Sequence, residues 1–270
     1  MTEDKSATQD TSSKEGIPAN EADSAPNSAA PAKSKAPARG FPGAGFFAAA
    51  SKRVSMESMI DNAIRCCKYA LDPKSPGVPR KLLEVCSGVA LLNTAQAGFV
   101  VSASGGTGVV MRRDESTGKW SPPSAIGVGG VGFGLVFGAD VKDILIVLID
   151  EASVKALSGE AQVKLGGQMG VAVGPIGREV EGGFNLSNKG AGMTFTYTYS
   201  KGLFAGINME GALLAARGSE NKKFYSAEAI SPEDILFKEG SVTVPDYCKE
   251  KVDELHKLLS LMERGETLEA

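Results

Sequence analysis

The chain has 270 residues, of which 42% are hydrophobic and 23% are charged, and its formal net charge is -3. No apolar run approaches the ~18–20 residues of a membrane span, and the first residues, MTEDKSATQD, are polar and unlike a secretory signal. We therefore expect a cytoplasmic protein without a transmembrane helix or a leader, built from one large domain or two small ones.

The first 45 residues differ in composition from the rest of the chain. They are rich in Ser, Ala, Pro, Lys and Glu, so they cannot bury enough apolar surface to offset their ordering entropy. We predict a disordered tail over residues 1–45. Between Asp23 and Glu57 the chain has no acidic residue, and we name residues 33–53 the cationic strip. The strip contains these basic and aromatic side chains: Lys33, Lys35, Arg39, Lys52, Arg53, Phe41, Phe46 and Phe47.

Residues 55–71, SMESMIDNAIRCCKYAL, have the pattern of an amphipathic helix. Ser55 can cap its N-terminus, and Glu57 suits the positive end of the helix dipole. One broad apolar arc contains Met56, Met59, Ile60, Ala63, Ile64, Cys66, Cys67, Ala70 and Leu71. The opposite face carries two acids and two bases, so it brings no net positive charge. Packing on its own domain is the favoured interpretation, and membrane insertion is the alternative.

Short elements follow a proline-rich turn. RKLLEV, which begins at Arg80, indicates a second, short helix. FVVSASGGTGVVMRR, residues 99–113, indicates two strands joined around Gly105-Gly106. The segment DESTG then predicts a turn that leads to the single tryptophan.

Further strands and a closing helix are predicted in the second half of the chain. ILIVLI, residues 144–149, indicates a strand buried on both faces, and Asp150 can cap the helix EASVKAL. MTFTYTYSKGLFAGINMEG has the pattern of an antiparallel hairpin with one packed face and a turn at Lys201-Gly202. From Pro245 onward, apolar residues at helical spacing indicate a closing amphipathic helix.

Most of the 33 glycines lie between Gly98 and Gly211, within the region predicted to form strands. Glycine weakens a strand, so this density indicates coiling, bulges or a close approach of backbones. The predicted fold class is α+β, with a Gly-rich, strongly curved antiparallel β-sheet, half-barrel or sandwich-like, and flanking N- and C-terminal amphipathic helices.

Gly127, Gly129 and Gly132 match the G-x-G-x-x-G spacing of dinucleotide-binding loops. That fingerprint needs a buried strand before it and a helix that opens at its third glycine. Here the turn WSPPS precedes the glycines, and FGLVFGAD follows with more glycines and β-favouring residues. We therefore expect no dinucleotide site.

The residues needed for catalysis or metal binding are scarce. His256 is the single histidine, which excludes a Ser-His triad and a multi-histidine metal site, and no G-x-S-x-G motif occurs. Glu179 and Glu181, with Arg178 beside them, are interpreted as a solvated charged edge. The four cysteines have no C-x-x-C spacing, so reduced structural thiols are expected. We predict that the protein is not an enzyme and has no catalytic residues, no metal, no cofactor and no nucleic-acid partner.

Five segments occur in an order that periodicity does not interpret: AGFVVSASGGTGVV (97–110), KWSPPSAIGVGGVGFG (119–134), LGGQMGVAVGPIGRE (165–179), YSKGLFAGINMEGA (199–212) and NKKFY (221–225). Together they resemble the SYLF domain family, lipid-binding domains of actin-associated proteins, over about residues 56–244. The resemblance implies phosphoinositide binding, an association with actin and no catalytic function. The chain departs from the family at Ser104, where many members have an arginine, and no Src-homology or FYVE module flanks the domain.

The resemblance also implies where lipid would bind, because the family uses an N-terminal amphipathic helix with basic neighbours. That region corresponds to the helix of residues 55–71 and to Lys52, Arg53, Arg65 and Lys68. The charges add a hypothesis: the cationic strip finds an anionic membrane, and Phe41, Phe46 and Phe47 anchor it. Five cations of the domain would then form a phosphate-binding surface: Arg65, Lys68, Lys74, Arg80 and Lys81. A solvated linker is the alternative interpretation of the strip.

These observations predict the domain organisation and the function together. Residues 46–264 form a single SYLF-like lipid-binding domain that includes the C-terminal helix, and residues 265–270 form a flexible end. The protein is expected to be an adaptor, peripheral at phosphoinositide-containing membranes linked to actin assembly. One alternative is an actin-filament-binding protein with incidental membrane contact. Another is a carrier of a small apolar ligand, in a cavity lined by strands 99–113 and 191–209.

Overall fold

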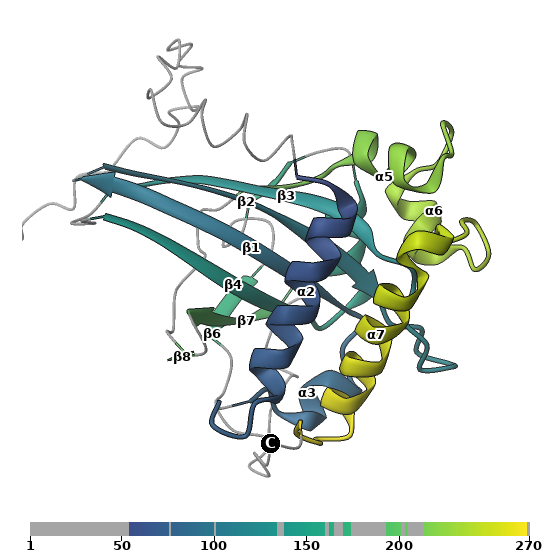
Figure 1. Cartoon of the computed structure of the whole chain (residues 1–270), viewed down its shortest axis with the longest axis horizontal. Coiled ribbons are helices and arrows are strands. Elements are labelled where there is room, and N and C mark those ends of the chain that lie inside the picture. The colour runs from purple at the N-terminus through teal and green to yellow at the C-terminus, as the bar shows by residue number, and fades with distance from the viewer. Residues whose placement is uncertain are drawn as a thin grey trace, which may run out of the picture. The chain divides into compact units, whose positions relative to one another are not determined.

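The computed structural model describes residues 54–75, 77–99, 101–133, 138–159, 162–164, 170–173, 193–200, 203–204 and 213–268 (Figure 1). The predicted tail and the whole cationic strip lie outside these residues. The boundaries proposed for the domain therefore stay a prediction. Among the described helices, none combines the length and the apolar character needed to cross a membrane.

Nine strands of the described residues form a single sheet, in the order β5-β9-β3-β2-β1-β4-β7-β6, with β8 paired to β7. Their bounds are β1 Gly88–Phe99, β2 Val101–Arg112, β3 Ser124–Phe133, β4 Gly138–Leu148, β5 Val163–Lys164, β6 Gly170–Val173, β7 Met193–Ser200, β8 Leu203–Phe204 and β9 Leu213–Ala216. Apart from β6, which is parallel to β7, every pair is antiparallel. The sheet is open, and the predicted α+β class is confirmed; its strong curvature stays a prediction.

The first hairpin does not turn at Gly105-Gly106, so that prediction is wrong. β1 and β2 pair along their whole length, and the glycine pair lies in the middle of β2. A Cβ atom on the nearby Gly108 would lie 2.8 Å from Cα of Leu92 and would overlap the carbonyl oxygen of Leu91. Glycine therefore serves here as the residue that lets two backbones approach closely.

The glycines with dinucleotide-loop spacing also lie inside a strand. Gly127, Gly129 and Gly132 all belong to β3, which pairs with β2 on one side and β9 on the other. The next strand, β4, begins at Gly138, so no crossover helix follows the third glycine. The local structure is therefore unlike the strand-turn-helix that holds a pyrophosphate.

Both faces of the central sheet are buried. On β1, Val89 and Leu91 point to one face, while Ala90 and Leu92 point to the other. This double burial explains the continuous apolar run Ile144–Leu148 of β4, in which every residue is buried.

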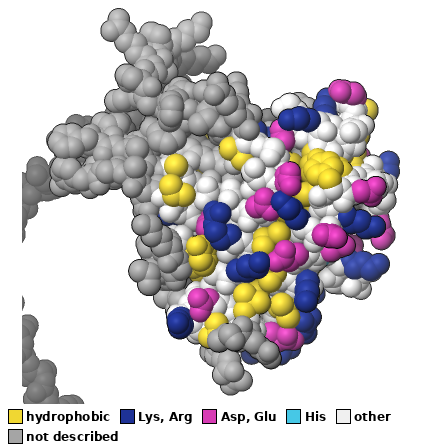
Figure 2. Space-filling view, viewed as in Figure 1, with side chains coloured by type: hydrophobic (Ala, Val, Ile, Leu, Met, Phe, Trp, Pro, Cys, Tyr) yellow, Lys and Arg dark blue, Asp and Glu magenta, His cyan; other side chains and the backbone are white. Residues whose placement is uncertain are grey.

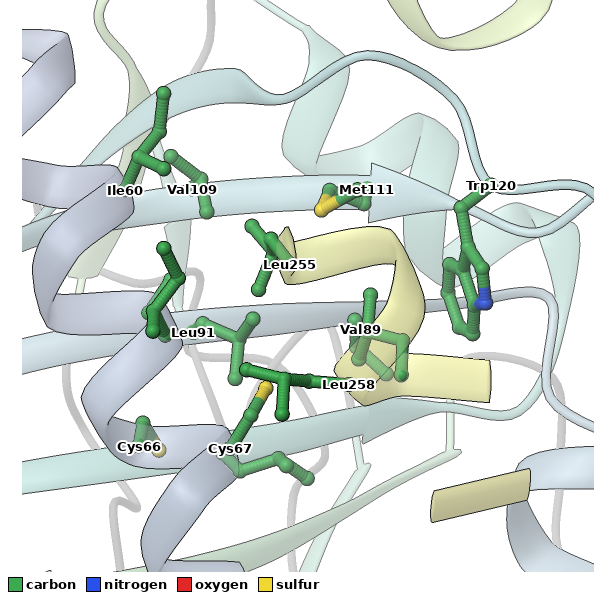
Figure 3. Packing of buried hydrophobic residues seen from close by; sticks show 14 of the residues in the cluster. Ile60, Cys66, Cys67, Val89, Leu91, Val109, Met111, Trp120, Leu255 and Leu258 are labelled. Atoms are coloured by element: carbon green, nitrogen blue, oxygen red, sulfur yellow. The ribbon is translucent and has the colours of Figure 1, made fainter. Parts of the chain in front are cut away.

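Helices cover each face. They are α2 (Met56–Leu71), α3 (Arg80–Glu84), α4 (Glu151–Ser158), α5 (Gly218–Tyr225), α6 (Pro232–Phe237) and α7 (Asp246–Glu263). α2 and α7 lie side by side across the first face (Figure 1), and their apolar side chains meet those of β1 and β2 (Figure 3). α4 packs on the second face, while α6 contributes Ile235 to the first cluster and Leu236 to the second.

Local signals explain why the helices begin where they do. The hydroxyl of Ser55 accepts a hydrogen bond from the Ser58 amide, as predicted for the cap of α2. The carboxylate of Asp150 accepts one from the Ser153 amide at 2.7 Å and caps α4, which confirms a second prediction. α6 was not predicted, although Ser231 forms a capping box with the aspartate three residues later, a pattern readable from the sequence.

The predicted hairpin around Lys201-Gly202 is confirmed by the antiparallel pairing of β7 with β8. One detail differs from the prediction, which placed a single face of β7 in the core. Phe195 and Tyr197 are buried on the first face, and Thr194 and Thr196, on the opposite side of the strand, are buried as well. Alternation of Thr with aromatic residues therefore did not mark a solvent-facing side.

The close contact of β1 with β2 predicts a sharp difference between two glycine substitutions. Gly108→Ala places a methyl group against the backbone of β1, so we expect the free energy of unfolding to fall by about 1–3 kcal/mol or more. Gly129→Ala is the control, because a Cβ there has no atom within 4 Å. Urea unfolding followed by circular dichroism measures both. Equal losses in the two variants would contradict the close-contact explanation.

Candidate functional site

α2 is the helix on which the lipid-binding prediction depends, and it packs on its own domain. All nine residues of its predicted apolar arc are buried. Burial of each large apolar side chain contributes about 1.5–3 kcal/mol, so exposing this face to a membrane would be costly. In this structure the face is therefore not available to lipid, and packing is the interpretation that holds.

The polar face of α2 is joined to α7 by ion pairs. The Nζ atom of Lys251 lies 2.9 Å from a carboxylate oxygen of both Glu57 and Asp61. These hydrogen bonds raise the pKa of Lys251, and the one to Asp61 has the larger effect. One turn away, the Nζ atom of Lys68 lies 2.8 Å from Glu254. Acids and bases therefore neutralise one another along this seam, and Figure 2 shows them interspersed over the face that α2 and α7 form.

Arg65 connects α2 to the sheet. Its Nε and Nη2 atoms donate to the two carboxylate oxygens of Asp143, at 2.8 and 2.7 Å. Asp143 is only 6% exposed and also accepts a hydrogen bond from Asn93 of β1. The hydrogen bonds to Asp143 raise the pKa of the Arg65 guanidinium. Arg65 thus links α2 to the sheet through Nε and Nη2, while its Nη1 atom donates to Asn62 of the same helix at 2.8 Å.

The remaining basic residues lie at the corner where α2 gives way to α3. The guanidinium of Arg80 pairs with Glu84 at 2.6 Å. Lys74, in the turn after α2, and Lys81, on α3, are exposed and have no carboxylate partner among the described residues. Of the seven predicted phosphate ligands, these two keep an unpaired charge in the described part of the chain. Lys52 and Arg53, like the anchor residues Phe41, Phe46 and Phe47, lie outside the described residues.

The NKKFY segment, the last of those quoted for the resemblance, has a clear structural role on α5. The side chain of Asn221, fully buried, accepts a hydrogen bond from the Ala125 amide at 2.7 Å and donates one to the Ser124 hydroxyl at 2.9 Å. The hydroxyl of Tyr225 donates to the Pro123 carbonyl at 2.6 Å. These hydrogen bonds hold α5 against the start of β3, so Asn221 and Tyr225 have a structural role.

A cleft of about 360 Å³ lies between the turn that joins β2 to β3 and the end of α6. Its lining includes Arg112, Lys119, Trp120 and Phe237, none of which the sequence analysis proposed as a site residue. His256 also lines it, and its Nε2 atom lies 3.1 Å from the Ser121 carbonyl oxygen. The described residues hold no group of three His, Cys, Asp or Glu side chains placed to bind a metal.

The four cysteines are free and buried, as predicted. Burial raises the pKa of the Cys67 thiol and of the Cys86 thiol to about 12, so both remain protonated at neutral pH. None of the four is paired in a disulfide.

A family model described as "Las17-binding protein actin regulator", Ysc84, matches residues 129–261. The chain carries a Ysc84 domain. The match begins within β3 and ends in α7, so it includes the NKKFY segment and the strands that follow the first hairpin. Ysc84 and SYLF are two names for the same domain family, so the resemblance to the SYLF family is confirmed.

Relatives share the Ysc84 domain with this chain. The SH3 domain-containing YSC84-like protein 1 of Bos taurus is 44% identical over 168 residues, which are 62% of this chain and 48% of the relative. Protein YSC84 of Saccharomyces cerevisiae is 36% identical over 168 residues, 62% of this chain and 35% of its own. LAS seventeen-binding protein 3 of the same species is 37% identical over 148 residues, 55% of this chain and 32% of its own. The matched region spans about half the length of the animal relatives, and no solved structure matches.

The Arg65–Asp143 contact predicts a stability difference between two charge deletions on α2. Arg65→Ala leaves a nearly buried carboxylate without its main partner, and we expect a loss of about 1–3 kcal/mol in unfolding free energy. Lys68→Ala breaks an exposed pair and should lose no more than about 1 kcal/mol. Urea unfolding compares them. Adding Asp143→Asn to Arg65→Ala should recover part of the loss, and failure to do so would argue against the buried charge as its cause.

The partial burial of His256 predicts a pH dependence of stability. Desolvation lowers the pKa of His256 in the folded protein, although the Ser121 carbonyl and Asp253 oppose this. The unfolded chain takes up a proton near its ordinary pKa of about 6.5, so it binds more protons than the folded state just below that pH. Stability should therefore fall as the pH drops from about 7 to about 5.5. Because the chain has one histidine, His256→Gln should flatten this slope in thermal unfolding, and equal slopes would contradict the prediction.

Proposed function

We propose that this chain is a non-enzymatic adaptor that binds phosphoinositide-containing membranes and connects them to actin assembly. The observation that carries the proposal is the Ysc84 domain, whose family description names a Las17-binding actin regulator. The name of one yeast relative likewise describes a protein that binds LAS seventeen. The protein would be cytoplasmic and peripheral at membranes.

The membrane contact in this proposal rests on charge. Each Lys or Arg near an anionic leaflet contributes about 1 kcal/mol, and the cationic strip has five such residues with no acid among them. Lys74 and Lys81 add two unpaired charges at the corner of α2 and α3. Because the apolar face of α2 is buried, apolar anchoring would come from Phe41, Phe46 and Phe47 of the strip.

A second candidate function is favoured by the same family description. An actin regulator can bind filaments directly, and its contact with membranes would then be incidental. High salt weakens both kinds of charged contact, so salt dependence does not separate the two functions. Binding to vesicles and binding to filaments have to be compared in the same variants.

The test is co-sedimentation of the full chain with vesicles that contain or lack a phosphoinositide. Neutralising the strip, with Gln in place of its five Lys and Arg residues, should weaken binding by up to about 1,000-fold, because about 1 kcal/mol is lost per charge that lies near the leaflet. Lys74→Gln with Lys81→Gln should weaken it several-fold. Lys222→Gln with Lys223→Gln is the matched control, because these lysines are also exposed but lie on α5, beyond the other end of α2.

Co-sedimentation of the same variants with actin filaments separates the candidates. The adaptor proposal expects vesicle binding that depends on the phosphoinositide and on the strip. Vesicle binding that is absent in every variant, together with filament binding by the unaltered chain, would overturn it in favour of the filament-binding function.

A further inference from the structure

The cleft beside the β2–β3 turn is lined by two side chains that each have one N–H group without a partner, although Arg112 also pairs with Asp114 through its Nη1 atom at 3.3 Å. Arg112 is the last residue of β2. Trp120 comes after the turn of residues 114–118 and forms an isolated antiparallel bridge with Arg113. Phe237 ends α6 on the other side. The cleft volume, about 360 Å³, is within the range of about 300–1,000 Å³ that small-molecule sites occupy.

Two buried N–H donors at this cleft have no hydrogen-bond partner. They are Nε of Arg112 and Nε1 of Trp120, and no other side chain of the described residues leaves a buried N–H group unpaired. Trp120 is only 8% exposed. Figure 3 shows its indole nitrogen on the ring edge turned away from Met111 and Val89. An unpaired buried donor is destabilising by about 1–3 kcal/mol, so two at one cleft call for a missing acceptor.

The charges around the cleft favour an acceptor that is an anion. Lys119 and Lys238 are exposed at its rim, and neither forms an ion pair among the described residues, although the charge of Lys238 helps to lower the pKa of Asp234. Asp114 is a competing anion: its Oδ1 atom accepts four hydrogen bonds within its own turn, and its Oδ2 atom lies 3.3 Å from Nη1 of Arg112, so an incoming anion has to share the guanidinium with it. The hydrogen bond from the Ser116 hydroxyl is the main reason that the pKa of Asp114 lies well below its ordinary value. Glu239 is the other carboxylate of the lining.

The remaining lining is mixed, with an apolar part at the end of α6 and polar side chains from Ser116, Thr117, Ser121 and His256. The guanidinium carbon of Arg112 lies 4.9 Å from the ring centroid of Phe237, which keeps this cation at the wall of the cleft. Pro122 and Ile235 also line it. An occupant that satisfies both parts of the surface must carry an anionic group and an apolar body.

We propose that the cleft between the β2–β3 turn and α6 binds a small amphipathic anion, a carboxylate or phosphate joined to an apolar or aromatic group. The anion accepts from the indole N–H of Trp120 and the guanidinium of Arg112, and Lys119 and Lys238 attract it. Its apolar body lies against Phe237. Both donor atoms are covered from solvent in this structure, so the side chains of Arg112 and Trp120 have to shift at the wall of the cleft for the acceptor to reach them. This site shares no residue with the corner of α2 and α3.

The single tryptophan of the chain gives a direct readout, because its indole N–H is one resolved signal in a proton–nitrogen NMR spectrum of the full chain. Benzoate and phenyl phosphate are the probes. Benzyl alcohol and inorganic phosphate are the controls, since each supplies one half of the proposed chemistry. We expect a saturable shift of the indole signal with benzoate or phenyl phosphate, and an affinity at least about tenfold weaker for the controls.

Variants locate the binding. Lys119→Gln with Lys238→Gln changes exposed side chains and should weaken the two anionic probes about five- to tenfold. Lys74→Gln with Lys81→Gln removes the same charge elsewhere and should change nothing. Trp120→Phe keeps an aromatic ring without the donor, and calorimetry should report weaker binding. No saturable shift with either anionic probe, or equal weakening by the two lysine pairs, would overturn the proposal.

A free anion and a lipid headgroup share this chemistry, and a further arm distinguishes them. Phosphoinositide vesicles are added to the unaltered chain and to the Lys119, Lys238 variant. Equal vesicle binding identifies a free ligand as the occupant. If the variant binds both vesicles and phenyl phosphate more weakly than the unaltered chain, the lipid headgroup is the occupant of the cleft. The NMR titration with phenyl phosphate needs no membrane. The anion-binding proposal for the cleft can therefore be refuted while the adaptor function holds, and the adaptor function can be refuted while the cleft still binds the anion.

Discussion

The packing of α2 against the sheet is the contact on which the rest of the domain depends. Its buried arc contacts β1, β2 and β4, and Arg65 ties the same helix to Asp143 inside the sheet. At its start, the Met56 amide donates to Glu220 of α5, and at its end, Leu71 accepts from Leu268. Elements from both ends of the described chain thus meet on one helix, and its removal would expose the part of the first face that α7 does not cover.

The sequence predicted the elements whose signals are local. The arc of α2, the cap at Asp150 and the apolar run of β4 need only neighbouring residues, and all three were found. β1 was missed because its sequence, GVALLNTAQAGF, has neither strict alternation nor an enrichment in β-branched residues. Gly105-Gly106 was misinterpreted because glycine favours turns and close backbone contacts alike, and only the partner strand tells which use applies.

The candidate site was less predictable than the fold, because its properties come from pairs distant in sequence. Five cations close to α2 looked like one phosphate-binding surface, yet Arg65, Lys68 and Arg80 each have a carboxylate partner. Asp143 is 78 residues from Arg65, and nothing local to either residue announces the pair. The cleft at Trp120 escaped for the same reason, since its walls come from a turn and a helix more than 100 residues apart.

The four buried thiols have a consequence for the environments in which the domain can work. A thiolate, not a thiol, attacks disulfides and is oxidised, and the raised pKa values of Cys67 and Cys86 keep that form rare. Because no disulfide holds the fold together, reduction removes nothing from it. The fold should therefore not depend on whether its surroundings are oxidising or reducing, and thiol chemistry at these cysteines would first require the core that covers them to open.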